Sequence, residues 1–305
     1  QVAATACSFP TATGCSSIWG NPAATAPYCK DKDGHGPAWN NSLFEDNAEH
    51  GLGMAVGYEA VQHKLIAATQ DIIAADGPSD ELKAAGQLID SVNDAEASKT
   101  AAAAYVAELE KCGCDASKAI LADKAYLTKK SFWIFGGDGW AYDIGFGGLD
   151  HVLASGHNVN VFVFDTEVYS NTGGQASKAS NLGQVAQFAA AGKVTKKKSL
   201  AEIAMSYGYV YVAQVAMGAN PAQTLKAIHE AEAYDGPSLI IGYSPCEMHS
   251  IKGGMVNCQK EMKRAVECGY WNMFRFNPML KAEGKTFTID SKQPVTEEYR
   301  NFLLN

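Results

Sequence analysis

From residue 131 onward, short apolar segments alternate with helical ones, and this alternation constrains the fold more than any other feature. The segments "SFWIFG", "NVNVFVFDT", "GYVYVAQVA" and "PSLIIGYSP" are apolar almost throughout, as is typical of strands buried on both faces of a parallel sheet. The helix at 220–236 is the most clearly delimited, with Asn before a first-turn Pro and Gly at its end. The pattern predicts an α/β fold: a doubly wound, mostly parallel sheet with helices on both faces.

Two regions depart from this pattern. Residues 78–128 are rich in Ala, Lys, Glu and Asp, and their spacing predicts two or three surface helices that form a helical insertion within a single domain spanning 1–305. Residues 1–42 are rich in Gly, Pro, Ser and Thr and are predicted to be loop with one short strand. The following "NSLFED" is predicted to begin a helix, with an Asn or Ser cap and carboxylates in the first turn.

Composition restricts the partners of the chain. Its 305 residues are 47% hydrophobic, which is enough for one large α/β domain or two small ones. The net charge of −8 argues against nucleic acid and anionic membranes as partners, and no apolar run approaches the roughly 18 residues that a membrane span needs. The first residues do not read as a signal peptide, so we expect the eight cysteines to be reduced thiols.

Glycines and an aspartate follow the first apolar strand, in "GGDGWAY" at 136–142. Ligands of parallel sheets bind at the carboxyl ends of the strands, where this segment lies. The glycines allow the backbone to approach a ligand, and Asp138 supplies a hard oxygen of the kind that Mg²⁺ prefers beside phosphates. Gly-Asp-Gly alone also occurs in many plain strand-to-helix turns, so this segment is not specific by itself.

A second polar segment, "DTEVYSNTGGQ" at 165–175, follows the next strand. Thr166 lies 28 residues beyond Asp138, one strand–helix–strand unit away, and a right-handed crossover brings the two segments side by side. We expect the Asp138 carboxylate, the Thr166 hydroxyl and a backbone carbonyl near Val168 to provide one octahedral Mg²⁺ site. The paired glycines that follow leave room for a diphosphate.

This spacing resembles the thiamine diphosphate motif, in which Gly-Asp-Gly is followed by Asn-Asn. No Asn-Asn occurs at that place after Gly-Asp-Gly, where "TEVYSN" stands instead. With that departure, the two segments resemble the variant found in pyruvate:ferredoxin (flavodoxin) oxidoreductases, specifically their C-terminal thiamine-diphosphate-binding domain. The resemblance covers nearly the whole chain, most weakly at 60–128, and includes "ATGCSSIWG", "GPAWNNSLFEDNAEHG", "AAAGK", "YGYVYVA" and "GPSLIIGYSPC".

The resemblance implies thiamine diphosphate held through Mg²⁺. It places Asp138, Thr166 and the Val168 carbonyl on the metal. Asn171 would act as a catalytic residue near the reactive thiazolium, and Phe44 would pack against the pyrimidine ring. The cofactor-binding residues implied in this way are Phe44, Gly137, Asp138, Gly139, Thr166, Val168, Asn171 and Gly173.

The family also holds a [4Fe–4S] cluster on four cysteines, and Cys15 and Cys246 match two of them. The other two form a Cys-x-x-Cys segment upstream in the family, whereas only Cys7 precedes Cys15 here. We therefore expect the missing pair to lie beyond Gln1 and the chain to be a fragment, with Cys7 as a substitute ligand left open. No role is implied for Cys29, Cys112, Cys114, Cys258 or Cys268, which we expect to be ordinary thiols.

The activity implied is oxidative decarboxylation of pyruvate to acetyl-CoA and carbon dioxide, in the pyruvate synthase class EC 1.2.7.1. Coenzyme A takes the acetyl group, and electrons pass to ferredoxin or flavodoxin. In this family another domain supplies the carboxylate that activates the cofactor and the arginine that binds the substrate, so we expect the isolated chain to be inactive. We expect a homodimer that contains the remaining domains of the same enzyme. Its location would be the cytoplasm, or a hydrogenosome or mitochondrion-related organelle of an anaerobic eukaryote.

Two alternatives stay open. The chain could be the β subunit of a multi-subunit 2-oxoacid:ferredoxin oxidoreductase, or a non-catalytic homologue, although the intact Asp138, Thr166 and Asn171 argue against the latter. The basic run "KVTKKKS", which begins at Lys193, is predicted to be a solvated loop. It could instead help to dock an acidic electron carrier.

Overall fold

A central sheet organises the protein, as seen in a computed structural model that describes residues 7–12, 34, 36, 38–42, 45–75, 79–291 and 298–303. The described part of the sheet has eight strands in the order β10-β9-β7-β8-β4-β3-β1-β2, and the six from β7 to β2 run parallel. β9 and β10 add an antiparallel edge. The strands are β1 (Cys7–Ala12), β2 (Ala38–Ser42), β3 (Ser131–Gly137), β4 (Asn160–Asp165), β7 (Tyr211–Val215), β8 (Ser238–Tyr243), β9 (Phe274–Phe276) and β10 (Phe287–Ile289).

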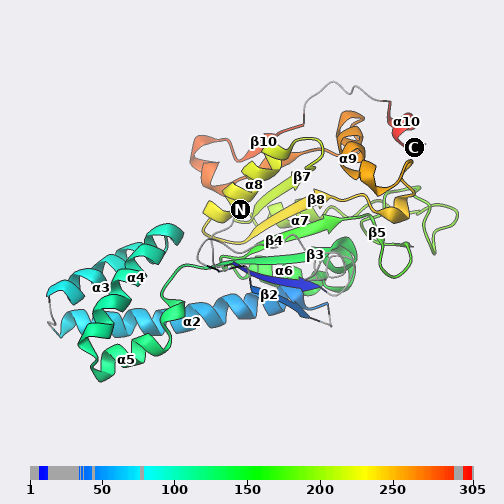
Figure 1. Ribbon diagram of the computed structural model, residues 1–305. Helices are drawn as coiled ribbons and strands as arrows, with labels where there is room; N and C mark the ends of the chain where they lie inside the picture. The colour runs from blue at the N-terminus through cyan, green and yellow to red at the C-terminus, as the bar shows by residue number, and fades with distance from the viewer. Residues whose placement is uncertain are drawn as a thin grey trace.

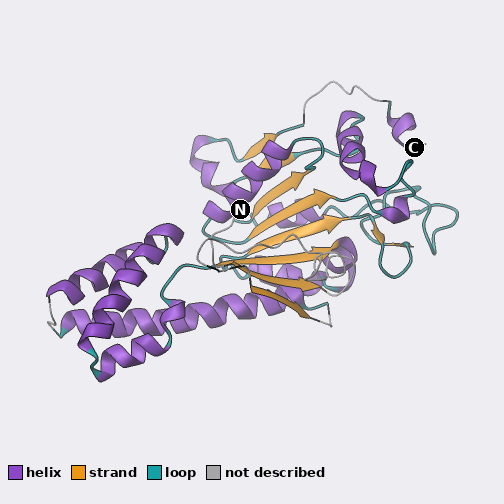
Figure 2. Ribbon diagram, viewed as in Figure 1, coloured by secondary structure: helices purple, strands orange, loops and turns teal. Residues whose placement is uncertain are grey.

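Helices cover both faces of this sheet (Figure 2). Alternate residues of a strand point to opposite faces, so Ile134 and Val212 join the larger core while Trp133 and Tyr211 join the smaller one. The helices α2 (Asn47–Ala74), α6 (Phe146–Ala154), α7 (Leu200–Ser206) and α9 (Cys258–Glu267) contribute to the larger core, and α8 (Pro221–Ala233) covers the opposite face. The predicted α/β fold, with its mostly parallel sheet and helices on both faces, is confirmed.

Three helices form an arm that projects away from the sheet (Figure 1). They are α3 (Ser79–Ser91), α4 (Ala95–Cys112) and α5 (Asp115–Ala122), and they pack with the second half of α2 around a separate core. That core contains Leu65 of α2 together with Leu88, Tyr105 and Ile120. The arm falls inside the residues expected to form a helical insertion, and the domain boundaries themselves stay a prediction.

Short elements complete the described chain. They are the 3₁₀ helices at Lys124–Tyr126, Glu247–His249, Met255–Asn257 and Pro278–Glu283, the π-helix η2 (Gly139–Ile144), the hairpin of β5 (Val168–Tyr169) and β6 (Gln175–Ala176), and α10 (Tyr299–Leu303). Among the described helices, none is long and apolar enough to cross a membrane.

The amino-terminal predictions need correction. The described residues of 1–42 form two strands rather than one, and β2 continues to Ser42 because it pairs with β1 through Thr11↔Asn41 and Ala12↔Ser42. The prediction that "NSLFED" starts the following helix is therefore wrong. Helix α2 begins at Asn47, and the side chain of the preceding Asp46 makes no capping hydrogen bond.

Candidate functional site

The carboxyl ends of β3, β4 and β8 meet at one edge of the sheet, on the right of Figure 1. Asp138 directly follows β3, Thr166 directly follows β4, and Cys246 lies just beyond β8. Because β4 pairs with β3 on one side and β8 on the other, residues distant in sequence become neighbours here. The structure thus brings the predicted magnesium ligands to the carboxyl ends of the strands, where Cys246, a predicted ligand of the iron–sulfur cluster, also lies.

Three oxygen atoms of the predicted magnesium ligands lie together. Thr166 Oγ1 is 2.6 Å from Asp138 Oδ1 and 3.0 Å from the Val168 carbonyl oxygen. Adjacent ligands of an octahedral Mg²⁺ site, each about 2.1 Å from the metal, are separated by roughly 3 Å. The donor types and these two separations fit one face of such a site.

The Asp138 carboxylate is buried and fully hydrogen-bonded. Thr166 N donates to its Oδ1 at 3.2 Å, and Ser177 Oγ donates to its Oδ2 at 2.7 Å. Burial, and then the nearby Asp165 carboxylate, raise the pKa of Asp138 to about 7. A bound divalent cation would offset both effects, since it favours the ionised carboxylate.

The polar segment after Asp165 forms a tight β-hairpin of β5 and β6. Gly174 N closes it by donating to Tyr169 O at 2.8 Å, and Gly173 and Gly174 have φ values of 125° and 82°, which side chains rarely adopt. Val168 is buried at the base of the hairpin, whereas Asn171 is exposed at its tip. The predicted catalytic Asn171 therefore points to solvent rather than into the Asp138 cluster.

The hairpin rests on the backbone at Gly139. A Cβ atom at Gly139 would lie 2.5 Å from the Tyr169 ring, so glycine is needed for this close approach. Gly137, by contrast, has open space where its Cβ would lie, with no atom within 4 Å. The π-helix η2 begins at Gly139, directly after Asp138. Its wider turn places the Tyr142 hydroxyl 2.8 Å from Asp165 Oδ2, to which it donates.

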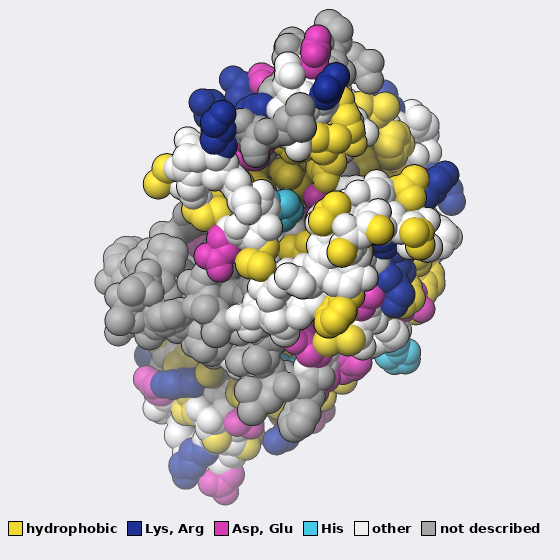
Figure 3. Space-filling model, turned by 90° about the vertical axis from the view of Figure 1, so that its right-hand side faces the viewer, with side chains coloured by type: hydrophobic (Ala, Val, Ile, Leu, Met, Phe, Trp, Pro, Cys, Tyr) yellow, Lys and Arg dark blue, Asp and Glu magenta, His cyan; other side chains and the backbone are white. Residues whose placement is uncertain are grey.

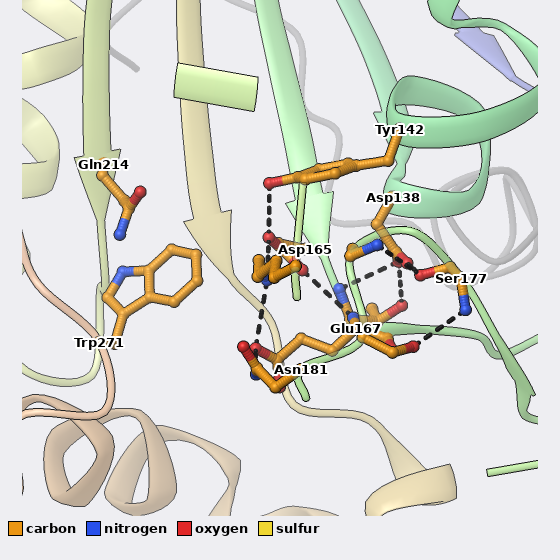
Figure 4. Close-up of polar contacts among 12 residues, drawn as sticks. Asp138, Tyr142, Asp165, Glu167, Ser177, Asn181, Gln214 and Trp271 are labelled. Atoms are coloured by element: carbon orange, nitrogen blue, oxygen red, sulfur yellow. Dashed lines mark hydrogen bonds and ion pairs between the residues drawn. The ribbon is translucent and has the colours of Figure 1, made fainter. Parts of the chain in front are cut away.

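The buried carboxylates of Asp165 and Glu167 lie close to each other (Figure 4). They flank Thr166 in the sequence, and one lysine binds both. Lys197 Nζ lies 2.7 Å from Asp165 Oδ2 and 3.2 Å from Glu167 Oε1. Burial lowers the pKa of Lys197, but the attraction of Asp165 and Glu167 outweighs it, so that its pKa is raised and the ammonium is retained. Sequence reasoning missed this ion-pair network.

Further contacts attach the 177–198 segment to Glu167. Asn181 Nδ2 donates to Glu167 Oε1 at 2.9 Å, and the Tyr270 hydroxyl donates to Glu167 Oε2. Lys193 Nζ donates to the carbonyls of Ser177 and Ser180 at 2.8 and 2.6 Å. The prediction that the basic run is a solvated loop is wrong for Lys193 and Lys197, which turn inward because buried oxygens bind their ammonium groups.

Cys246 is connected to the same cluster by hydrogen bonds. Its Sγ is 3.0 Å from Ser170 Oγ, which in turn lies 3.1 Å from Thr166 Oγ1. Burial raises the pKa of the Cys246 thiol, but hydrogen bonds from His249 and Ser170 outweigh it and lower that pKa overall. This environment favours the thiolate form that a metal cluster requires.

The other predicted site residues at the amino terminus, Cys15 and Phe44, lie outside the described residues, as does the Cys7 side chain. Across the part of the chain that the structure describes, no group of three or more His, Cys, Asp or Glu side chains could hold a metal ion. The candidate magnesium site differs in kind, since it has one carboxylate beside a hydroxyl and a carbonyl. The structure therefore leaves the iron–sulfur prediction untested.

Comparison with known proteins identifies the family. Residues 99–241 match the model of the thiamine pyrophosphate enzyme C-terminal TPP binding domain. The chain is 55% identical over 299 residues to the pyruvate-flavodoxin oxidoreductase of Klebsiella pneumoniae and 54% identical over 301 residues to the pyruvate:ferredoxin oxidoreductase of Moorella thermoacetica, with 96% of the chain covered in both. The chain belongs to the pyruvate:ferredoxin (flavodoxin) oxidoreductase family. The predicted resemblance is confirmed.

The match to these pyruvate oxidoreductases covers only part of them. The chain spans 25% of the length of either relative. It is also 50% identical over 292 residues to the mitochondrial NADP⁺-dependent pyruvate dehydrogenase of Euglena gracilis, covering 92% of this chain and 16% of that one. A solved 2-oxoglutarate:ferredoxin oxidoreductase from Magnetococcus marinus has a TM-score of 0.45 at 16% identity, covering 80% of this chain and 56% of that one. That likeness is too low to carry an argument.

Proposed function

We propose that the chain is the part of a pyruvate:ferredoxin (flavodoxin) oxidoreductase that holds the Mg²⁺–diphosphate end of thiamine diphosphate. The observation that carries this proposal is the cluster of Asp138, Thr166 and Val168 oxygens, at 2.6 and 3.0 Å separations, at the carboxyl ends of β3 and β4. Bound thiamine diphosphate would supply the electron sink for decarboxylation of pyruvate. The family membership supports the reaction class, which yields acetyl-CoA and carbon dioxide.

Each residue of the cluster has a distinct part in this proposal. Asp138 supplies the charge of the site, and Thr166 and the Val168 carbonyl complete its protein ligands. Ser177 holds the second Asp138 oxygen at 2.7 Å and so fixes the orientation of the carboxylate. The ion pairs of Lys197 hold Asp165 and Glu167, and with them the backbone of Thr166. These residues therefore preform the metal site before a ligand arrives.

The backbone around this cluster leaves room for a diphosphate. Gly137 is the last residue of β3 and has no atom within 4 Å of where its Cβ would lie, and Gly173 lies in the turn of the facing hairpin, whereas the Tyr169 ring already covers Gly139. Neither Gly137 nor Gly173 has a side chain, so the phosphate groups can approach the peptide N–H groups there closely. Asn171, exposed at the hairpin tip, is placed to meet a ligand or domain that covers this end of the sheet. Its role near the reactive carbon remains part of the proposal.

For the iron–sulfur cluster, we propose Cys246 and Cys15 as two of the four ligands. The Cys246 thiol has a lowered pKa, and the Ser170 hydroxyl connects it to Thr166, one of the proposed magnesium ligands. A [4Fe–4S] cluster bound there would accept electrons close to the thiamine site. Ferredoxin or flavodoxin would be the final acceptor.

The surface around the site supports packing against other domains. Figure 3 looks onto this end of the sheet, where many exposed side chains are hydrophobic. The exposed apolar residues on segments near the site are Ile144, Leu182, Val185, Phe188, Val194 and Met248. We propose that the remaining domains of the same enzyme cover them, exclude water, and supply the activating carboxylate and the substrate-binding arginine, within a homodimer that also binds coenzyme A. The cytoplasmic or organellar location stays a prediction.

Calorimetric titration with thiamine diphosphate, with and without Mg²⁺, tests this proposal on the chain. We expect binding that requires the metal and is lost in Asp138→Ala, with the exposed Asp115→Ala as a matched control that binds normally. Binding that does not require Mg²⁺, or unchanged affinity in Asp138→Ala, would contradict the assignment of Asp138 to the metal. The absence of any binding would favour a non-catalytic scaffold. Pyruvate-dependent viologen reduction by the isolated chain should be absent, and robust activity would contradict the expected need for further domains.

A further inference from the structure

Two exposed cysteines lie one residue apart on the helical arm. Cys112 is the last residue of α4, Cys114 is the N-cap of α5, and Gly113 between them adopts a left-handed φ of 61°. The arm projects away from the carboxyl ends of the strands, so this pair takes no part in the candidate cofactor site (Figure 1). Both thiols are accessible to a reagent in solution.

The two sulfurs can join without a large movement of the chain. A disulfide needs Cα atoms about 4.4–6.8 Å apart, and residues two apart in sequence are separated by at most about 7 Å. Only Gly113 separates the two cysteines, at the junction where α4 ends and α5 begins, and both side chains are exposed there. The positive φ of Gly113 makes this reversal between α4 and α5 accessible to the backbone.

The surroundings distinguish the two thiols. Cys114 Sγ lies 3.1 Å from Ser117 Oγ, and Ser117 N donates to the same sulfur at 3.5 Å. The sulfur also caps the first turn of α5, where the helix dipole favours negative charge. The Ser117 hydroxyl, then the Ser117 N–H and the Cys112 thiol, lower the pKa of Cys114 to about 7.

We propose that Cys112 and Cys114 form a thiol–disulfide exchange site for low-molecular-weight disulfides, with Cys114 as the attacking thiolate and Cys112 as the resolving thiol. The Cys114 thiolate attacks one sulfur of the reagent, its disulfide bond breaks, and one thiolate of the reagent leaves. The Cys112 thiolate then attacks Cys114 Sγ and expels the second thiolate. The two protein thiols are oxidised to a disulfide, and the reagent is reduced to two thiols, with two protons passing to solvent or to the released thiolates.

Treatment of the fully reduced 305-residue chain with glutathione disulfide, followed by peptide mass spectrometry, tests the site. The expected product in the native chain is an intramolecular disulfide between Cys112 and Cys114. The Cys112→Ser variant should instead accumulate a glutathione adduct on Cys114. At pH 7 this adduct should form at least about threefold faster than the adduct on Cys112 in Cys114→Ser, because the Ser117 hydroxyl and N–H stabilise the Cys114 thiolate.

Further measurements separate the proposed exchange from loss of folding and from non-specific reaction of thiols. Cys114→Ser retains a good N-cap residue, so α5 should stay folded by circular dichroism. Ser117→Ala should slow adduct formation on Cys114, whereas Ser206→Ala, which removes an exposed serine hydroxyl elsewhere, should not. The buried Cys268 should stay unmodified in the folded chain. Adducts that persist on Cys114 in the native chain, equal rates at Cys112 and Cys114, or no reaction of either thiol would each overturn the proposal.

Discussion

Lys197 Nζ lies 2.7 Å from Asp165 Oδ2, beneath the rings of Tyr142 and Trp271, whose centroids are 5.6 and 5.3 Å away. Asp165 is fully buried and directly precedes Thr166. The ion pair therefore fixes the exit of β4, from which a proposed magnesium ligand projects. Removing one member of such a pair leaves an uncompensated buried charge, which costs far more than an exposed pair contributes.

Lys197→Met should therefore destabilise the chain by about 3–5 kcal/mol and weaken Mg²⁺-dependent thiamine diphosphate binding. Lys197→Arg keeps the charge and should restore part of both. The neighbouring Lys196→Met is the matched control, because this lysine is exposed and its replacement should stay within about 0.5 kcal/mol. Urea unfolding and calorimetry measure the two effects. Equal stability of Lys197→Met and Lys196→Met would contradict the role of the ion pair.

The raised pKa of Asp138 predicts how stability changes with pH in the absence of metal. The raised pKa keeps a proton on Asp138 in the folded chain up to a pH of about 7, whereas an unfolded Asp releases it near its ordinary pKa of 3.8. This contribution to stability is complete below about pH 4 and is lost as the pH rises towards and through 7.

Asp138→Asn removes that titration. The stability of the native chain relative to this variant should fall as the pH rises from 5 to 8, by at most about 1.4 kcal/mol per pH unit. Urea unfolding of both proteins across this range, without divalent cations, provides the comparison. A difference in unfolding free energy that does not vary with pH would show that Asp138 titrates normally in the folded chain.

The close approach of the hairpin to Gly139 gives a steric prediction. Gly139→Ala places a methyl group 2.5 Å from the Tyr169 ring, so the hairpin with Val168 must shift, at a cost of about 1–3 kcal/mol. Mg²⁺-dependent cofactor binding should weaken as well. Gly147→Ala in α6 is the control, since no atom lies within 4 Å of its Cβ and alanine favours the helix. Normal cofactor affinity in Gly139→Ala would argue against the placement of Val168 on the metal.

A second ion-pair cluster lies at the antiparallel side of the sheet, where the buried Arg275 meets two half-buried carboxylates. Arg275 on β9 makes a bidentate contact with Asp290, at 2.8 and 2.9 Å, and a further ion pair with Glu230. Arg275→Met should lower the free energy of unfolding by about 3–5 kcal/mol, because Asp290 and Glu230 lose their partner. Cofactor affinity of the folded fraction should be unchanged, which separates this variant from Lys197→Met. If Arg275→Met lost as much cofactor affinity as Lys197→Met, strands β9 and β10 would also contribute to the geometry of the site.

The depressed pKa of Asp290 adds an acid-side prediction. Burial raises this pKa, but the hydrogen bonds and charge of Arg275 outweigh it and lower it below 3.8 overall. The stabilisation is present above about pH 4 and disappears as the pH falls through the folded pKa. The stability difference between the native chain and Arg275→Met should therefore narrow below pH 4 in chemical unfolding experiments. A constant difference down to the lowest pH would exclude Asp290 as its source.

Local patterns predicted much of the fold. Asn220 caps α8 through Gln223 N, with Pro221 in the first turn, as expected from the sequence, and the four apolar segments after residue 131 are the strands β3, β4, β7 and β8. The edge strands β9 and β10 escaped prediction because each has only three residues, and their strand conformation depends on pairing with β7 and with each other. Helix α2 began later than predicted because strand pairing by β2 competes with the capping pattern.

The sequence predicted the site only where a ligand-type residue directly follows a recognisable strand. Asp138 and Thr166 each follow a buried strand, so their meeting could be inferred from the sheet topology. Lys197, in contrast, lies in a run of lysines that reads as a solvated surface, and only the tertiary fold shows that one of them binds two buried carboxylates. Asn171 carries a predicted role that its exposed position does not test.

The single helix α2, 28 residues long, belongs to two separate cores: Ala55 and Tyr58 pack into the core of the sheet, and Leu65 packs into that of the arm. Because the helix is continuous, the backbone hydrogen bonds between Tyr58 and Leu65 connect the two cores. Amide hydrogens in the middle of α2 should therefore exchange with solvent only on global unfolding, so the arm and the sheet would constitute one cooperative folding unit.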